Sequence, residues 1–151
     1  MRTFADVFEL VAAEGEHLGY SDWLTITQDR IDRFADATGD HQWIHVDREK
    51  AAAGPFGTTI AHGYLSLSLL PHFGPQIYTL EKPPTMGVNY GLNRVRFLQP
   101  VTEGSRVRGG IELTEAKETP KGRLLTMQHQ VDIEGEERAA LVAEALVLLV
   151  P

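Results

Sequence analysis

Hydrophobic and polar positions follow different patterns in the two halves of the chain. In the first half apolar residues recur three or four positions apart, which is the spacing of one helix face. The second half alternates or contains runs of valine, isoleucine and leucine, which is typical of strands. The first helix predicted in this way covers residues 4–14 and ends before Gly15, and a brief strand is predicted over residues 23–26.

A second helix is predicted between Thr27 and Gly39. Thr27 suits the N-cap position, and apolar residues follow it at helical spacing. Gly39 suits the left-handed residue that ends a helix. Asp40 is therefore expected just past the end of this helix.

The most hydrophobic stretch of the chain predicts a buried central helix. Residues 60–70 contain few polar side chains, and apolar character all round indicates burial on all sides. We expect this helix to begin near His62 or Gly63 and to continue past Pro71 with a kink. The glycine- and proline-containing segments on either side are predicted as a loop, residues 46–59, and a flap, residues 74–87.

The second half predicts an antiparallel sheet. Four segments rich in branched apolar residues are separated by turn residues: 88–98, 106–115, 123–134 and 138–150. The last segment also contains alanine, leucine and glutamate, which suit a helix, but its valines and the close turn at Gly135 favour a strand. Helices followed by a strand meander give an α+β fold, with the sheet wrapped around the buried helix.

Composition narrows the classes of protein. A chain of 151 residues with 42% hydrophobic content is expected to form a single domain. The absence of cysteine excludes disulfides and thiolate metal sites, and residues 1–13 lack the apolar core of a signal peptide, so a cytoplasmic location is expected. No apolar run is long enough for a membrane span, and the net charge of −7 argues against partners such as nucleic acid or an anionic membrane.

Positive charge is nevertheless concentrated in one region. Half of the fourteen lysine and arginine residues lie between positions 94 and 123. An anionic ligand could find local positive charge there. Arg94 and Arg96 are expected on the face of their strand opposite Val95 and Phe97, where either solvent or a phosphate could meet them.

Candidate chemistry is concentrated in residues 38–45, Thr-Gly-Asp-His-Gln-Trp-Ile-His. Asp40 and His45, five positions apart in a predicted loop, can converge on one water. A carboxylate beside an imidazole is equipped to take and give protons near neutral pH. The simpler interpretation is a turn-forming aspartate and an ordinary, partly buried histidine.

The evidence for a functional role is weaker for the other polar residues. His41 and His45 have a helical metal-ligand spacing, but Gly39 is expected to end the helix before them, so no metal site is expected. His129 alternates with apolar neighbours and is predicted to be a hydrogen-bonded core histidine. Ser66 and Ser68 have no basic partner that would make either a nucleophile. The candidates for positioning the pair or the substrate are Gln42, His62, Asn89 and Asn93.

The segment from Ala37 to His45, together with Ala51 and the Ile60-Ala61-His62-Gly63 segment, resembles the MaoC-like family of (R)-specific enoyl-CoA hydratases. The strand at residues 89–97 is also similar to that of single-domain bacterial members. The family motif is Gly-Asp-x-Asn-Pro-aliphatic-His. Here Gln42 and Trp43 occupy the Asn and Pro positions, so the catalytic pair is kept while the shape around it is altered.

The resemblance implies a hotdog fold, an antiparallel sheet curled around one long helix, and a homodimer paired through edge strands. It implies reversible addition of water to a trans-2-enoyl-CoA, giving an (R)-3-hydroxyacyl-CoA, with no metal or redox cofactor. Asp40 and His45 match the catalytic residues, and Gly63 matches the backbone donor to the thioester oxygen. His62, Gln42, Asn93 and Arg94 are the expected substrate-binding residues.

Chemical reasoning supports these roles without choosing between them. Asp40 and His45 can deprotonate the attacking water and supply a proton to Cα, but the sequence does not say which is the base. Gly63 at a helix start would offer free N–H groups and the helix dipole to a developing oxyanion. A thioesterase of the same fold and a non-catalytic acyl-binding subunit are the alternatives, and chain length and the choice between CoA and acyl-carrier protein are left open.

Overall fold

The fold is a curved antiparallel sheet that wraps around two consecutive helices. The computed structural model describes residues 1–151. The helices are α1 (Val7–Ala12), α2 (Gln28–Thr38), α3 (Trp43–Val46), α4 (Arg48–Ala52), α5 (Gly63–Ser68) and α6 (Leu70–Ile77). The strands are β1 (Arg2–Phe4), β2 (His17–Tyr20), β3 (Leu24–Thr25), β4 (Tyr78–Leu80), β5 (Met86–Phe97), β6 (Arg106–Thr119), β7 (Gly122–Ile133) and β8 (Leu141–Val150).

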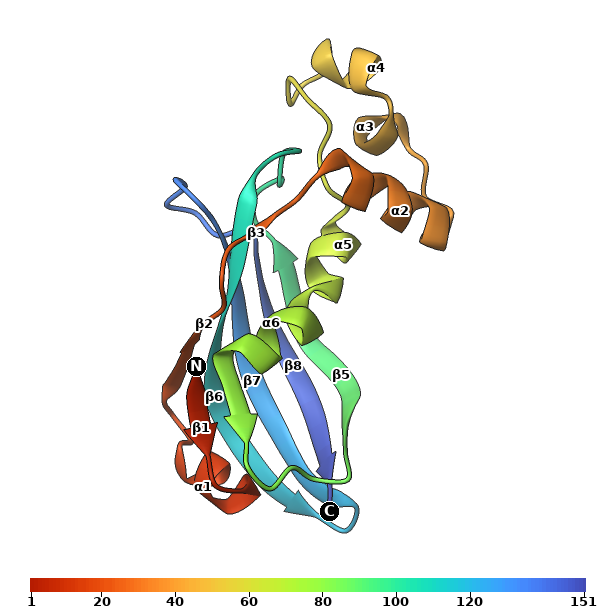
Figure 1. The fold of residues 1–151 in the computed structure, drawn as a ribbon. Helices are drawn as coiled ribbons and strands as arrows, with labels where there is room; N and C mark the ends of the chain where they lie inside the picture. Colours follow the sequence, from red (N-terminus) through yellow and green to blue (C-terminus); the bar gives the residue numbers. More distant parts are fainter.

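The main sheet has the strand order β2-β6-β7-β8-β5, with β3 pairing on β6, and all its pairs are antiparallel. A separate two-stranded sheet joins β1 to β4 in parallel. Helices α5 and α6 cross the concave face of the main sheet, whereas α2, α3 and α4 project beyond one end of it (Figure 1). The α+β prediction and the wrapped sheet are therefore confirmed.

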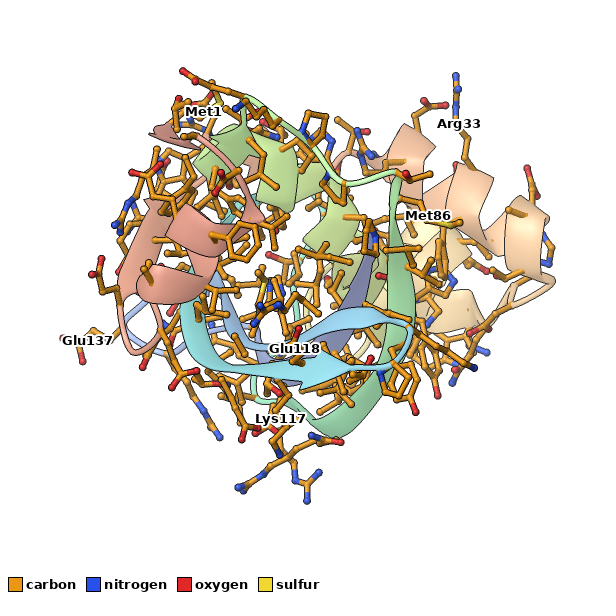
Figure 2. All side chains as sticks on the ribbon, turned by 90° about the horizontal axis from the view of Figure 1, so that it is seen from below. Met1, Arg33, Met86, Lys117, Glu118 and Glu137 are labelled. Carbon is orange, nitrogen blue, oxygen red and sulfur yellow. The ribbon has the colours of Figure 1, made fainter.

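One hydrophobic core lies between the helices and the concave face of the sheet. Inward positions alternate along each strand, as on β7, where Leu125, Met127 and Val131 are buried. Phe73 and Ile77 of α6 pack on this face and are almost fully buried. Side chains fill the interior between helices and sheet, while those of Arg33 and Lys117 are directed away from it (Figure 2).

The four long strands were predicted correctly, including the choice of strand for the last segment. Their boundaries differ: β6 continues to Thr119 and β8 begins only at Leu141. The helix between Thr27 and Gly39 is also confirmed. No helix of the structure is long and apolar enough to cross a membrane.

Several predicted boundaries and environments are wrong. The first helix is shorter than residues 4–14 because the Asp6 side chain caps it at Phe8 and Glu9 and the residues before it form β1. The predicted loop at residues 46–59 contains α4, whose N-cap Asp47 accepts a hydrogen bond from the Lys50 N–H. The flap at residues 74–87 is instead the end of α6, followed by β4 and a short connection to β5.

The central helix begins at Gly63 and continues past Pro71, as predicted, but it is interrupted at Leu69. Pro71 lies in the first turn of α6, where a residue's N–H has no acceptor within the helix. A proline is therefore tolerated there, and the interruption at Leu69 comes before it. Burial on all sides is wrong, because Tyr64 of α5 is 71% exposed.

Candidate active site

Asp40 directly follows the end of α2, and the way this helix ends determines its position. The Thr27 hydroxyl accepts the Arg30 N–H at 3.2 Å, and Gly39 ends the helix in the left-handed region with φ of 81°. Asp40 then turns back, and its Oδ1 accepts the Gln42 N–H at 3.2 Å. The carboxylate thus forms the expected turn with one oxygen and still faces the site.

His45 is held in a single helical turn, α3, and not in a loop as predicted. Its side chain is buried, and its Nδ1 lies 2.7 Å from the carbonyl oxygen of Ile60. A carbonyl only accepts, so Nδ1 is the donor and a neutral His45 carries its lone pair on Nε2.

Burial is the main influence on the charge of His45. It lowers the pKa of His45 below the ordinary value of 6.5, and the nearby His62 lowers it further. The hydrogen bond to Ile60 and the negative charge of Asp40 act in the opposite direction. His45 is therefore neutral at pH 7, with Nε2 able to accept a proton.

His62 completes the cluster. It is buried at the start of α5, and its Nε2 donates to the backbone carbonyl of Asp40 at 2.9 Å. Its Nδ1 is buried without a hydrogen-bond partner. Its ring stacks on that of His45, and the Phe34 ring lies 4.9 Å away, centroid to centroid. Polar atoms of Asp40, His45 and His62 all lie within 4.8 Å of one another.

Two histidines and a carboxylate are also a common metal-binding set, but their arrangement here suits proton transfer better. The two imidazoles are stacked 3.8 Å apart with their planes only 22° from parallel, so their in-plane lone pairs lie in two separate, nearly parallel planes. A tetrahedral ion needs lone pairs that converge on one point. His41, the other histidine in the segment, pairs with Asp36 at 2.9 Å.

Gly63 lines a pocket of about 280 Å³. As the first residue of α5, it has an N–H with no acceptor in a preceding helical turn. A Cβ at this position would lie 3.0 Å from the Phe97 ring, so only glycine leaves the approach to the backbone open. Because α5 is interrupted at Leu69, the free N–H contributes more here than a long helix dipole.

The pocket is mostly apolar and adjoins the cluster. Ile60, whose carbonyl holds His45, is part of its wall. The remaining lining residues are Ala61, Gly63, Ser66, Phe97, Leu98, Gln99, Pro100, Val101, Ala140 and Leu141.

The other predicted substrate-binding residues are dispersed. The exposed side chain of Gln42 forms no capping bond for α3. Asn93 donates to Glu144 at 2.7 Å on the surface of the sheet, and Arg94 is exposed on the same strand. The structure brings His62 to Asp40 and His45, but within one chain it does not bring Asn93 or Arg94 there. Arg96 bonds to the backbone carbonyl of Val95, on the exposed side as predicted.

Three polar residues near the site were not predicted to have a role in it. Ser66 is buried and lines the pocket, and its position three residues after Gly63 on a helix was a signal that it shares the same face. Gln28 and Thr59 are buried behind His45. No motif marks these two, since their partners lie far away in the sequence.

A sheet wrapped around a central helix is the hotdog fold, and a neutral histidine and a carboxylate grouped at the helix start equip it for acid–base chemistry. Residues 9–134 match the family model described as MaoC like domain. The chain belongs to this family and is a MaoC-like dehydratase.

Its relatives agree with this assignment. It is 54% identical to the 3-hydroxyacyl-thioester dehydratase Z of Mycobacterium tuberculosis over 148 residues, which cover 97% of each chain. It is 49% identical to nodulation protein N of Rhizobium leguminosarum over 137 residues, covering 89% of this chain and 85% of the relative. Among solved structures, an unliganded R-hydratase of Pseudomonas aeruginosa superposes with a TM-score of 0.72 at 25% identity, covering 91% of this chain and 81% of that one.

Proposed function

We propose that the protein catalyses the reversible hydration of a trans-2-enoyl thioester, such as an enoyl-CoA, to the (R)-3-hydroxyacyl thioester. The observation that carries this proposal is the grouping of Asp40 and a neutral His45 with His62, next to which Gly63 lines an apolar pocket. The names of its relatives, a 3-hydroxyacyl-thioester dehydratase and an R-hydratase, refer to the same class of reaction.

In this mechanism His45 acts through Nε2. The lone pair on Nε2 takes a proton from water while the carboxylate of Asp40 accepts the other O–H and orients it. The water oxygen forms a bond to Cβ, and the electron pair of the C=C bond moves toward the thioester oxygen. The imidazolium then returns its proton to Cα, so one water is added across the double bond on one face. Dehydration runs through the same steps in reverse.

Gly63 stabilises the negative charge that develops on the thioester oxygen. Its N–H donates to the thioester oxygen, which gains charge as the enolate forms. Removing one such donor costs other enzymes roughly 3 to 4 kcal/mol of barrier. The acyl chain enters the pocket that Ser66 and Phe97 line. These steps use only acid–base groups and a backbone donor, and we infer no metal or redox cofactor.

We further infer a homodimer joined through β5. This strand forms one edge of the sheet, and all but one of its twelve residues are exposed. The large exposed hydrophobic residues on it are Met86, Val88, Tyr90, Leu92 and Phe97. A long edge strand with several exposed hydrophobic side chains is suited to pair with another strand, and a second copy of β5 offers the same edge. Because Phe97 contacts Gly63, such an interface would adjoin the pocket.

The direct test mixes the purified protein with crotonyl-CoA and follows the loss of enoyl thioester absorbance, with chiral analysis of the product. The proposal is supported if the wild type forms (R)-3-hydroxybutyryl-CoA and the Asp40→Asn variant does not. Release of free CoA from saturated acyl-CoA without hydration would instead show a thioesterase. Substrate binding without turnover, also on a longer enoyl-CoA and on an enoyl-acyl-carrier protein, would show a binding subunit.

A further inference from the structure

The helical turn that carries His45 has little stability of its own. Helix α3 contains four residues, and its N-cap Gln42 forms no side-chain hydrogen bond. Its first position is Trp43, which lacks the fixed φ that a proline would supply. An isolated turn of this length is not stable in water. Contacts from outside must therefore hold α3 and the ring of His45.

Gln28, the first residue of α2, makes such contacts. Its side chain is largely buried, and its Nε2 donates to the backbone carbonyl of His45 and to Asp32 Oδ1, both at 2.8 Å. Its Oε1 accepts a hydrogen bond from the hydroxyl of Thr59, which is also buried. Both amide hydrogens and the amide oxygen are thus used, so the orientation of the amide is fixed.

These bonds reach the backbone of His45 and the residue next to Ile60, to which the His45 ring is bonded. The carbonyl of His45 lies in the last turn of α3 and has no donor within that helix, so Gln28 supplies one. Thr59 immediately precedes Ile60, whose carbonyl accepts the His45 Nδ1–H and whose N–H donates to the Ile44 carbonyl at 3.0 Å. Gln28 therefore connects the backbone that carries His45 with the segment to which its ring is bonded.

We propose that Gln28 is a positioning residue for His45: its amide joins α2, α3 and the Thr59–Ile60 segment, and so holds the imidazole with Nδ1 as donor to Ile60 and Nε2 free to accept. Gln28 is not among the pocket-lining residues and acts only through His45. The consequence for catalysis rests on the proposed function, in which Nε2 takes a proton from water. The orientation of the ring does not depend on that function.

The first experiment therefore needs no activity. Nitrogen-15 NMR of labelled histidines reports the tautomer and the pKa of His45 in the wild type, Gln28→Ala and Thr59→Val. We expect the Nδ1–H tautomer in the wild type and a mixture of tautomers in Gln28→Ala. We also expect the pKa to move up toward its ordinary value as water enters behind the ring. Gln130→Ala is the matched control, because Gln130 also donates to an aspartate but lies exposed on β7.

The second experiment measures kinetics on an enoyl-CoA. We expect Gln28→Ala to lower kcat by roughly ten- to a hundred-fold with little change in KM, the size of effect seen in metalloproteins when a hydrogen-bond partner of a metal-ligating side chain is lost. Gln28→Glu keeps the volume and the acceptor for Thr59 but loses both donors, so it should lose a similar factor. Thermal unfolding of each variant shows whether the protein remains folded at the assay temperature.

The outcomes separate the two proposals. If Gln28→Ala and Gln28→Glu keep the wild-type tautomer, pKa and kcat, positioning by Gln28 is overturned, even when the melting temperature falls. If Gln28→Ala does not fold, Gln28→Glu and Thr59→Val decide the question by the same measurements. An altered tautomer in Gln28→Ala together with no turnover by the wild type supports positioning while refuting the hydratase.

Discussion

The imidazole rings of His45 and His62 are stacked, with centroids 3.8 Å apart. Burial disfavours the charged form of His45 and lowers its pKa, and the stacked His62 acts in the same direction. The structure thus keeps a base in its neutral form beside a carboxylate. The pH dependence of the reaction should report this.

We expect kcat/KM to fall on the acid side with a midpoint below pH 6.5. The pKa of His45 is lowered, so the neutral, accepting form persists to more acid pH than for a free histidine, and activity is lost as the pH falls through the lowered value. Initial rates across pH 4.5 to 8 with crotonyl-CoA measure it. A midpoint at or above 6.5 would contradict the assignment of His45 as the proton acceptor.

Replacing Asp40 by asparagine should lower kcat by about 10²- to 10⁴-fold without unfolding the protein. Asparagine keeps an oxygen that can accept the Gln42 N–H, so the turn is retained while the charge is lost. Asp36→Asn is the matched control, because Asp36 is an exposed carboxylate of α2 that pairs with His41. Equal rates for the two variants would remove Asp40 from the mechanism.

Gly63→Ala should lower activity by tenfold or more while changing the free energy of unfolding by no more than about 1 kcal/mol. The new methyl group meets the Phe97 ring at 3.0 Å, and this half-exposed ring can move aside, but it then enters the approach to the Gly63 N–H. Steady-state kinetics and urea unfolding test both parts. Full activity would show that no substrate atom comes close to this backbone.

Leu92→Lys should convert a dimer into a monomer. Leu92 lies exposed on edge strand β5, and a lysine there opposes pairing with a second strand. Sedimentation velocity measures the mass, with Phe8→Lys as control because Phe8 is an exposed hydrophobic residue on α1. If the wild type is a monomer, or if both variants stay dimeric, pairing through β5 is wrong.

His129 should make the fold sensitive to acid. Burial lowers the pKa of His129 to about 4. The predicted core position of His129 is confirmed, but its Nδ1 has no hydrogen-bond partner, so the predicted hydrogen bonding is wrong for that atom. Between pH 6.5 and 4 the unfolded chain binds a proton that the folded chain does not, and stability is lost as the pH falls. The difference between 6.5 and about 4 corresponds to about 3 kcal/mol.

The measurement compares urea unfolding of the wild type and His129→Leu at pH 7 and pH 4. Titrating carboxylates affect both proteins equally, so the difference between them isolates the histidine. We expect the wild type to lose about 3 kcal/mol more than the variant over this interval. Parallel loss in both proteins would show that His129 titrates normally.

The sequence predicted those features that depend on local pattern. Helix α2 was correct because a cap, an apolar stripe and a terminal glycine all lie within its own residues. The strands were correct because valine and isoleucine alternate around clear turns. Strand β4 was missed because its only partner is β1, more than seventy residues away, and the local glycine and proline content indicated a flap.

The same division applies to the site. Residue spacing and family resemblance predicted Asp40, His45 and Gly63 as site residues, and the structure places Asp40 beside His45. The stacking of His62 on His45 was not predicted, because it depends on how α3 and the start of α5 meet. The bonds of Gln28 to His45 and Thr59 join residues 17 and 31 positions away, and glutamine carries no chemistry that would single it out.

The parallel pairing of β1 with β4 has a consequence for synthesis on the ribosome. Residues Arg2–Phe4 are made well before their partner Tyr78–Leu80, and the core that Phe4 joins also contains Leu149 from β8. The short helices between them are not stable by themselves and cannot remain folded before the strands of the sheet have been made. The nascent chain must therefore remain exposed until β8 has left the exit tunnel, and early pauses in translation should increase its need for chaperones.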